Sequence, residues 1–381
     1  MKGLPVFKLL STFLAVALLA PLSARGEDAP APPPKWYDTF EIHGLVDTYY
    51  SATFGQAQSD ANLLRTFDGA NGFQLSYTKL TAQLAPTTAY TAGFRADLGF
   101  GPAAKVLSLG KDGGTGPVTD VNGNEIGTAT VSGGDGVTTF YVQQAYVSLK
   151  LPADIVLDAG KFVTNTGAEV IEAKDNWLYS RSILFGFAIP FTHTGVRATI
   201  PVPGVEGVSV MAAVFNGFDN PPSTVGSKKM GHLALMYSGP SSTLVVLNAL
   251  YGYAAPGDAD ERLLLDGVVA RAFGDLTLNV NADYNKLGEA SNWGIAGMAR
   301  YSFLGDKFRV SARAEYLDDT DGGMAGIGTK VYEGTLCASI PVGSNAEVRL
   351  EGRRDFSDDP IFKGGANKDQ TTVQVAALAW F

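Results

Sequence analysis

The sequence predicts an all-β protein, a closed antiparallel transmembrane β-barrel of about 16 strands, with 14 or 18 strands as the alternatives. Three observations predict this fold class. The composition is unusual, segments of about ten residues alternate between apolar and polar positions, and the connections between them alternate between short and long. Alternating strands joined in this way are typical of outer-membrane barrels, which have short periplasmic turns and long external loops.

The composition excludes two other classes of protein. The chain has 381 residues, of which 45 are glycine and 18% are charged, and its formal net charge is −9. Average proteins contain about 7% glycine and about 25% charged residues. After residue 26 no apolar run approaches the roughly 20 residues that a spanning helix needs, which excludes a helical membrane protein. The 21 Phe, 15 Tyr and 4 Trp residues argue against intrinsic disorder.

The first residues predict an export signal. Lys2 and Lys8 precede an apolar stretch over residues 9–20, and small residues follow Pro21. This pattern indicates a secretory signal peptide over residues 1–26, cleaved after Ala24 or Gly26, with an uncleaved anchor as the alternative. Residues 27–37 then form a proline-rich spacer, and residues 38–381 form the barrel.

Sixteen segments show the period-2 alternation of strands. In segment 275–286, for example, Leu278, Val280 and Ala282 fall on one face, and asparagines and an aspartate fall on the other. The apolar faces carry small residues with aromatics near the strand ends, as expected of a lipid-facing wall. The predicted strands are 39–52, 71–85, 88–100, 138–151, 154–163, 188–201, 205–216, 230–238, 243–254, 261–273, 275–286, 292–303, 307–317, 328–341, 345–356 and 370–381.

The connections predict how the barrel is oriented. Seven short ones interleave strictly with eight that are generally longer, namely 53–70, 101–137, 164–187, 217–229, 255–260, 287–291, 318–327 and 357–369. Short turns would face the periplasm and long loops the outside, and closure of the barrel would leave no unpaired strand edge in lipid.

The C-terminal strand carries a further signal. Val373, Val375, Ala377 and Ala379 occupy alternate positions, and the sequence ends on Phe381. An alternating strand that ends on an aromatic residue resembles the signal read by the bacterial barrel-assembly machinery. We therefore assign Phe381 as an assembly signal, with a soluble domain that happens to end on a strand as the alternative.

The middle of the chain resembles a known family. An ordered series of short motifs (QQAYVSL, AGKF, GAE, N, SRS, P and HTG) lies between residues 143 and 196. The series resembles the OmpL-like family of β-barrel outer-membrane porins, over residues 36–381. The resemblance implies a barrel that passes small solutes and adds little about selectivity.

The third long connection is the predicted constriction of the pore. Residues 167–173 could form a turn or two of helix, and the surrounding loop carries charge that would narrow the lumen if it folded inward. Acidic and basic groups facing each other would filter polar solutes by charge and size. The alternative is that Glu169 and Arg181 pair structurally or lie in the external vestibule. The candidate lumen residues are Lys161, Glu169, Glu172, Asp175, Arg181, Arg197, Arg309, Arg313, Arg349 and Arg353.

Other candidate sites are weaker. His43, His193 and His232 show no metal-ligand spacing, so no metal and no cofactor is expected. A lipid hydrolase that uses His193 with Ser182 stays an alternative. Residues 120–125 begin like a calcium loop, but Glu125 stands where glycine is required, so an Asn-Gly hairpin is the better interpretation.

These patterns together predict a non-enzymatic porin of the outer membrane of a Gram-negative bacterium, through which small hydrophilic solutes diffuse passively. A plugged structural or adhesive barrel is the alternative from another class. The expected partners are outer-membrane lipid, lipopolysaccharide and the barrel-assembly machinery. The acidic residues of the outer loops are expected to form a solvated surface, with divalent-cation bridging to lipopolysaccharide as the alternative. Nucleic acid is excluded by the negative charge. Whether three barrels form a homotrimer stays open.

Overall fold

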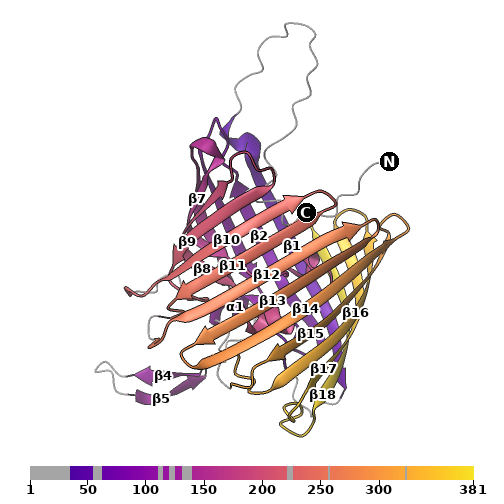
Figure 1. Ribbon diagram of the computed structural model, residues 1–381. Helices are drawn as coiled ribbons and strands as arrows, with labels where there is room; N and C mark the ends of the chain where they lie inside the picture. Colours follow the sequence, from indigo (N-terminus) through magenta and orange to yellow (C-terminus); the bar gives the residue numbers. More distant parts are fainter. Residues whose placement is uncertain are drawn as a thin grey trace.

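The barrel contains 16 antiparallel strands. The computed structural model describes residues 35–54, 62–109, 115–119, 125–130, 140–220, 226–255, 258–321 and 324–381. Around the wall the order is β1-β18-β17-β16-β15-β14-β13-β12-β11-β10-β9-β8-β7-β6-β3-β2, so every wall strand pairs with its neighbour in sequence and β18 closes on β1 (Figure 1). The predicted fold class is confirmed, including the strand count.

The strands lie where the alternation places them, and their ends differ from the predicted ends by four residues at most. Their bounds are β1 Phe40–Phe54, β2 Gly72–Leu84, β3 Ala92–Phe100, β6 Phe140–Lys150, β7 Val156–Val163, β8 Thr192–Pro201, β9 Val208–Phe215, β10 Met230–Gly239, β11 Thr243–Gly252, β12 Arg262–Phe273, β13 Leu276–Leu287, β14 Ala290–Phe303, β15 Phe308–Asp318, β16 Lys330–Val342, β17 Ala346–Ser357 and β18 Asp369–Trp380. The helical elements are η2 Trp36–Thr39, α1 Pro102–Leu109, η3 Pro152–Asp154, η4 Ala173–Asp175 and α2 Ile183–Phe187. None of these helices within the described ranges is long and apolar enough to cross a bilayer.

The wall has its polar side inward. On β17, Arg349 and Glu351 are at most 2% exposed, whereas Val348 and Leu350 are 42% and 54% exposed. A soluble domain of this size would bury the valine and the leucine instead. The apolar outer face therefore matches a surface solvated by lipid tails.

Aromatic side chains form two rows on this outer face, near opposite ends of neighbouring strands. Ring centroids within the rows lie 4.5–5.7 Å apart. The rows are Trp293, Tyr316 and Tyr332 near the long loops, and Tyr301, Phe303 and Phe308 near the short turns. They have the position expected of the two interfacial girdles of a membrane barrel.

Phe381 takes part in closing the barrel. Its backbone exchanges two hydrogen bonds of 3.1 Å with Gly44, one residue beyond the ladder that joins β1 to β18. The phenyl ring lies over Gly44 at a point where a Cβ atom would overlap it. Gly44 thus permits a close approach that a larger residue would prevent. The role of Phe381 as an assembly signal stays a prediction.

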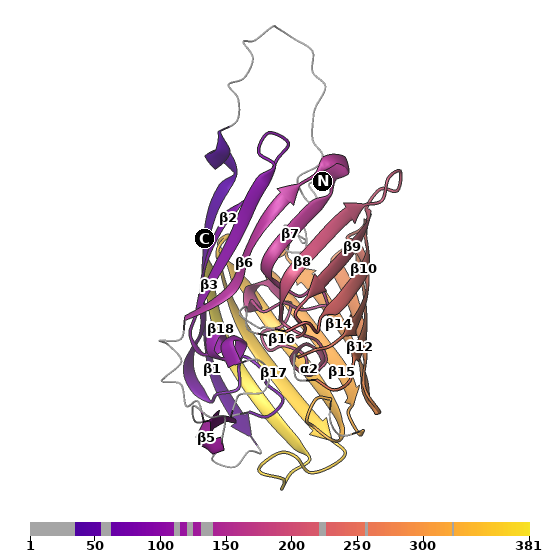
Figure 2. The same ribbon diagram turned by 90° about the vertical axis from the view of Figure 1, so that its left-hand side faces the viewer.

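The connections differ from expectation at one point and contain a predicted hairpin at another. The predicted long connection 287–291 is a tight turn of two residues, because β13 ends at Leu287 and β14 begins at Ala290, with Gly288 in the left-handed region at φ +57°. In the second long connection, β4 Thr115–Thr119 pairs with β5 Glu125–Thr130 as the predicted hairpin, and its turn lies outside the described residues. Figure 2 shows β5 beyond the rim of the barrel.

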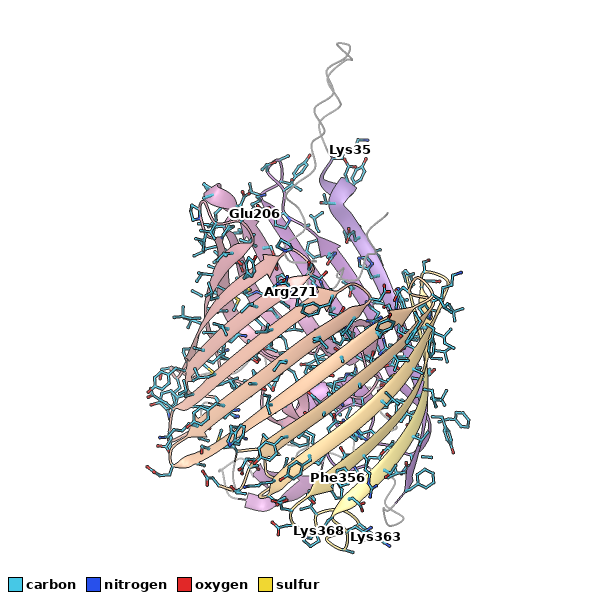
Figure 3. All side chains as sticks on the ribbon, turned by 45° about the vertical axis from the view of Figure 1, so that its right-hand side comes forward. Lys35, Glu206, Arg271, Phe356, Lys363 and Lys368 are labelled. Atoms are coloured by element: carbon cyan, nitrogen blue, oxygen red, sulfur yellow. The ribbon has the colours of Figure 1, made fainter. Side chains whose placement is uncertain are left out.

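The two mouths of the barrel are distinct. In Figure 3, Lys35 and Glu206 mark the end with the short turns, and Phe356, Lys363 and Lys368 mark the end with the long loops. The predicted signal peptide over residues 1–26 and most of the predicted spacer lie outside the described residues. Their boundaries stay predictions.

Candidate functional site: the lumen segment

Residues 164–191, between β7 and β8, cross the interior of the barrel, and we call them the lumen segment (Figure 2). Wall residues on several sides hold it. The Tyr179 hydroxyl donates to Asp47 on β1 at 2.9 Å, and Asn285 on β13 donates to the Ala188 carbonyl at 3.0 Å. Strands β1 and β13 are separated by at least five strands in either direction around the wall, so the segment spans the lumen.

The short helix predicted over residues 167–173 is wrong. The side chain of Asn176 bonds the backbone N–H and carbonyl of Val170 at 2.9 and 2.7 Å, which replaces helical bonds there. The helical turns are η4 and α2 instead. At α2 the Ser182 hydroxyl accepts from the Phe185 N–H at 2.9 Å, an N-cap that starts the helix.

Two wall carboxylates anchor the segment through its backbone. Glu351 on β17 accepts the N–H groups of Tyr179 and Ser180 at 2.6 and 3.0 Å. Glu315 on β15 accepts those of Ile183 and Leu184 at 2.6 and 3.1 Å. Hydrogen bonds to a charged acceptor are the strong ones, so these four hold the loop to one side of the wall.

Three predicted arginines bind the same stretch through its carbonyl groups. Arg313 donates to Ser180 O and to Glu169 Oε1, each at 2.8 Å. Arg349 and Arg353 donate to the carbonyls of residues 173, 178 and 181 at 2.6–3.0 Å. Of the predicted acidic–basic pairs, the structure therefore brings Glu169 together with Arg313.

Glu172 pairs with a residue that the sequence analysis did not single out. Lys79 on β2 contacts both Glu172 and Asp97, and Gln143 on β6 donates to Glu172 at 2.9 Å. Burial is the largest single influence and opposes ionisation, but the Lys79 ammonium and the hydrogen bonds from Lys79 and Gln143 together outweigh it and lower the pKa of Glu172 to about 2. The alternation in segment 71–85 places Lys79 on the polar face, a signal that could have found it.

Asp175 has a different environment. It is buried beside Lys174, whose ammonium lies 2.6 Å from its carboxylate. Burial is the larger effect and raises the pKa of Asp175 to about 6, with Lys174 opposing it.

The other predicted lumen residues lie in local contacts. Arg181 donates to the carbonyl of Tyr179 at 2.8 Å and lies over the Phe67 ring, and no contact joins it to Glu169. The remaining pairs are Lys161 with the Tyr141 hydroxyl at 2.7 Å, Arg197 with Asp158 at 2.9 Å, and Arg309 with Glu347 at 3.0 Å and with Asp306.

An apolar cluster lies in the lumen on the long-loop side, which the sequence analysis did not foresee. Phe185 and Phe191 of the lumen segment pack against Phe67 of the first long loop, with centroids 5.2–6.1 Å apart. Inward-facing apolar residues near the ends of several strands complete the cluster: Phe215, Met230, Leu250, Leu264, Leu317 and Val331. The period-2 alternation cannot identify them, because near these strand ends apolar residues occur on the inner face as well as on the outer face.

Two cavities lie toward the short turns, and only the smaller one is lined by residues of the lumen segment. The larger, about 840 Å³, lies between β2, β3 and β6–β9 and is lined by Arg95, Tyr146 and Asp158 among others. The smaller, about 320 Å³, lies against β11–β15 and β17, and Glu169, Asp175 and Arg309 are the predicted lumen residues that line it. The other seven predicted lumen residues line neither of them.

The histidines form no catalytic or metal centre in the described part of the chain. His193 bonds the Gly217 carbonyl and the Thr164 hydroxyl at 3.0 and 3.2 Å, whereas the Ser182 hydroxyl caps α2. The structure therefore does not bring Ser182 and His193 together. Among the described residues, no three His, Cys, Asp or Glu side chains are grouped so that they could hold a metal ion.

One outer acidic cluster organises its own loop. Asp319 is fully buried and accepts the N–H groups of Ala325, Ile327 and Gly328 at 3.0–3.1 Å. This carboxylate is therefore committed to loop structure. The binding of lipopolysaccharide through divalent cations stays a prediction for the other acidic loop residues.

Solved structures similar to this chain are outer-membrane barrels. OmpT of Vibrio cholerae in its trimer form is 13% identical, with a TM-score of 0.56 over 90% of this chain and 99% of that one. The anion-selective porin from Comamonas acidovorans is 14% identical, with a TM-score of 0.55 over 90% and 99%. The outer membrane channel DcaP of Acinetobacter baumannii is 11% identical, with a TM-score of 0.53 over 90% and 97%. At these identities the likeness shows the fold alone.

A family model assigns the chain to a protein family, which the similar structures at these low sequence identities cannot do. The model described as "Putative beta-barrel porin-2, OmpL-like" matches residues 39–381, which is the whole barrel. The comparison with curated proteins finds no match. The fold and the family together place the protein in the bacterial outer membrane. The chain belongs to the OmpL-like β-barrel porin-2 family.

Proposed function

We propose that the protein is a porin for the passive diffusion of small hydrophilic solutes, and that the lumen segment is its constriction. The observation that carries the proposal is a polar, charge-paired interior crossed by one anchored loop, with a cavity of about 320 Å³ beside the loop and one of about 840 Å³ nearer the short turns. A closed barrel of 16 strands is wide enough for an aqueous channel unless loops fill it. The channels and porins among the similar folds support a non-enzymatic role.

Selectivity in such a channel would come from fixed charges at the constriction. Glu169 with Arg313 and Glu172 with Lys79 place acidic groups on the segment opposite basic groups on the wall. Apposed charges of this kind orient and retard polar solutes according to their charge. The other predicted lumen residues would set the field farther along the path.

A second candidate, a plugged structural or adhesive barrel, rests on a specific observation. The cluster around Phe67, Phe185 and Phe191 packs tightly on the long-loop side. In a channel this cluster would have to open or leave a path beside it, whereas a plugged barrel needs neither.

Liposome swelling and planar bilayers separate the two candidates. The porin should admit small sugars with a sharp size limit and conduct ions in discrete steps. Glu169→Gln with Glu172→Gln should shift the reversal potential toward anions, because two negative charges are removed and their basic partners remain. Glu289→Gln, at the exposed two-residue turn, is the matched control and should change nothing.

The outcomes decide clearly. Absence of both swelling and conductance in protein that has folded and inserted would reject the porin. Conductance with unchanged ion selectivity in the double variant would keep the porin but reject the assignment of these two glutamates. Cross-linking in membranes tests the homotrimer that we propose by analogy with the trimer form of OmpT.

A further inference from the structure

The smaller cavity combines an apolar wall with charged groups. It lies on the short-turn side of the lumen segment and has a volume of about 320 Å³, near the lower end of the range for small-molecule sites. Trp177, Val246, Val268 and Met298 supply apolar surface. A cavity of this size and lining suits a compact, partly apolar molecule.

The acidic groups that line this cavity all have basic partners. Glu169 is paired with Arg313 at 2.8 Å, and Asp175 with Lys174 at 2.6 Å. Asp306 and Glu347 both contact the guanidinium of Arg309. These carboxylates and their partners therefore neutralise one another to a large extent.

Arg300 on β14 differs from these lining residues. Its Nε is buried and has no hydrogen-bond partner, and no ion pair joins Arg300 to a carboxylate among the residues that the structure describes. Its cross-strand neighbours, Thr277 and Ser311, carry no charge. Arg309 and Arg349 add to the positive potential at Arg300, and Glu347 and Asp306 reduce it.

A buried guanidinium N–H without an acceptor is costly, and an anion that accepts from the Nε of Arg300 would remove that cost. Inorganic anions would satisfy the charge but would leave the apolar wall against water. A carboxylate on a compact apolar or aromatic body satisfies both, because its oxygens match the fork of the guanidinium.

We propose that this cavity is a binding subsite for small organic carboxylates, with Arg300 as the residue that receives the carboxylate. The proposal deepens the proposed function and rests on it in one respect, since solutes must enter the lumen to reach the site. The subsite would hold such anions on the periplasmic side of the constriction.

The test measures binding apart from conduction. The full chain, folded in detergent, is titrated with benzoate by calorimetry, with benzylamine and benzyl alcohol as probes of the same shape. Benzoate should bind saturably and the other two should not. Arg300→Gln should weaken benzoate binding by about tenfold to a hundredfold, the range for a lost charged hydrogen bond. Arg271→Gln, exposed on the outer face, is the matched control and should bind as the wild type does (Figure 3).

Arg300→Lys is a second, more conservative variant for the case that Arg300→Gln does not fold. It keeps the positive charge but loses the planar guanidinium, so it should bind benzoate with intermediate affinity. Equal binding of benzoate and benzylamine, no benzoate binding by the wild type, or unchanged affinity in folded Arg300→Gln would overturn the proposal. Conductance is recorded separately in planar bilayers. Binding without conductance would reject the porin and keep the subsite, whereas conductance without binding would do the reverse.

Discussion

Replacing Glu315 and Glu351 together by glutamine should release the lumen segment from the wall. Each carboxylate accepts two backbone N–H groups of the segment, at 2.6–3.1 Å. A glutamine of the same shape offers one oxygen, and its amino group would face the second N–H. Each substitution therefore loses at least one charge-assisted bond and leaves a buried donor unpaired.

The magnitude follows from these four bonds. One hydrogen bond to a charged acceptor contributes about 1.5–3 kcal/mol, so the double variant should lose about 3–6 kcal/mol of docking free energy. At about 1.4 kcal/mol for each factor of ten, the population of the released segment should rise by about 10² to 10⁴.

The native cysteine reports this release. Cys337 is the only cysteine of the chain, faces inward from β16, and is fully buried against Leu178 of the lumen segment. Its reaction with a water-soluble maleimide should follow the population of the released state when docking is fast relative to labelling. Single-channel conductance should rise in parallel.

Labelling and conductance within twofold of the wild type, in a variant whose barrel is folded by heat-modifiable gel migration, would refute the reasoning. Glu289→Gln, at the exposed turn, controls for loss of an acidic residue as such. The single variants should fall between the wild type and the double variant, since their anchor points are independent.

Three further outcomes are expected. Because burial raises the pKa of Asp175 from its usual 3.8 to about 6, lowering the pH from 7 to 5 neutralises it and should shift the reversal potential toward anions, a shift that Asp175→Asn should abolish. The same raised pKa favours the protonated folded state, so its contribution to stability should fall as the pH rises through about 6. Gly44→Val should displace the Phe381 ring and destabilise the barrel, lowering its free energy of unfolding by about 1–3 kcal/mol in urea titrations. Gly297→Val should have little effect, because the space around Gly297 is open. Leu336→Arg, on the exposed outer face of β16, should cost about 2–4 kcal/mol in vesicles if this face contacts the centre of the bilayer.

The fold could be predicted from the sequence because its evidence is local. Whether Val348 or Arg349 faces lipid depends only on the alternation within one strand. The same local pattern is present in each of the sixteen strands, so each strand supports the prediction independently. The tight turn at Gly288 and Glu289 was not predicted, because β14 begins two residues earlier than its alternation pattern indicates.

The candidate site was only partly predictable. The lumen segment and its acidic residues were recognisable as a charged long loop, but their partners were not. Lys79 lies 93 residues from Glu172, and Glu351 lies 172 residues from Tyr179, so no local pattern connects them. Arg300 was not singled out, because its importance comes from the absence of a partner, which only packing reveals.

The sequence by itself determined a membrane barrel of about 16 strands with a polar interior, and it identified the long charged loop as the candidate to fold inward. The period-2 pattern and the lengths of the connections are properties of consecutive residues, and they suffice for those conclusions. Only the tertiary structure decided which charges pair, that Phe67 and Phe185 pack together on the long-loop side of the lumen, and that Arg300 lines a cavity. Those features depend on side chains that the closed barrel brings together from strands far apart in the chain.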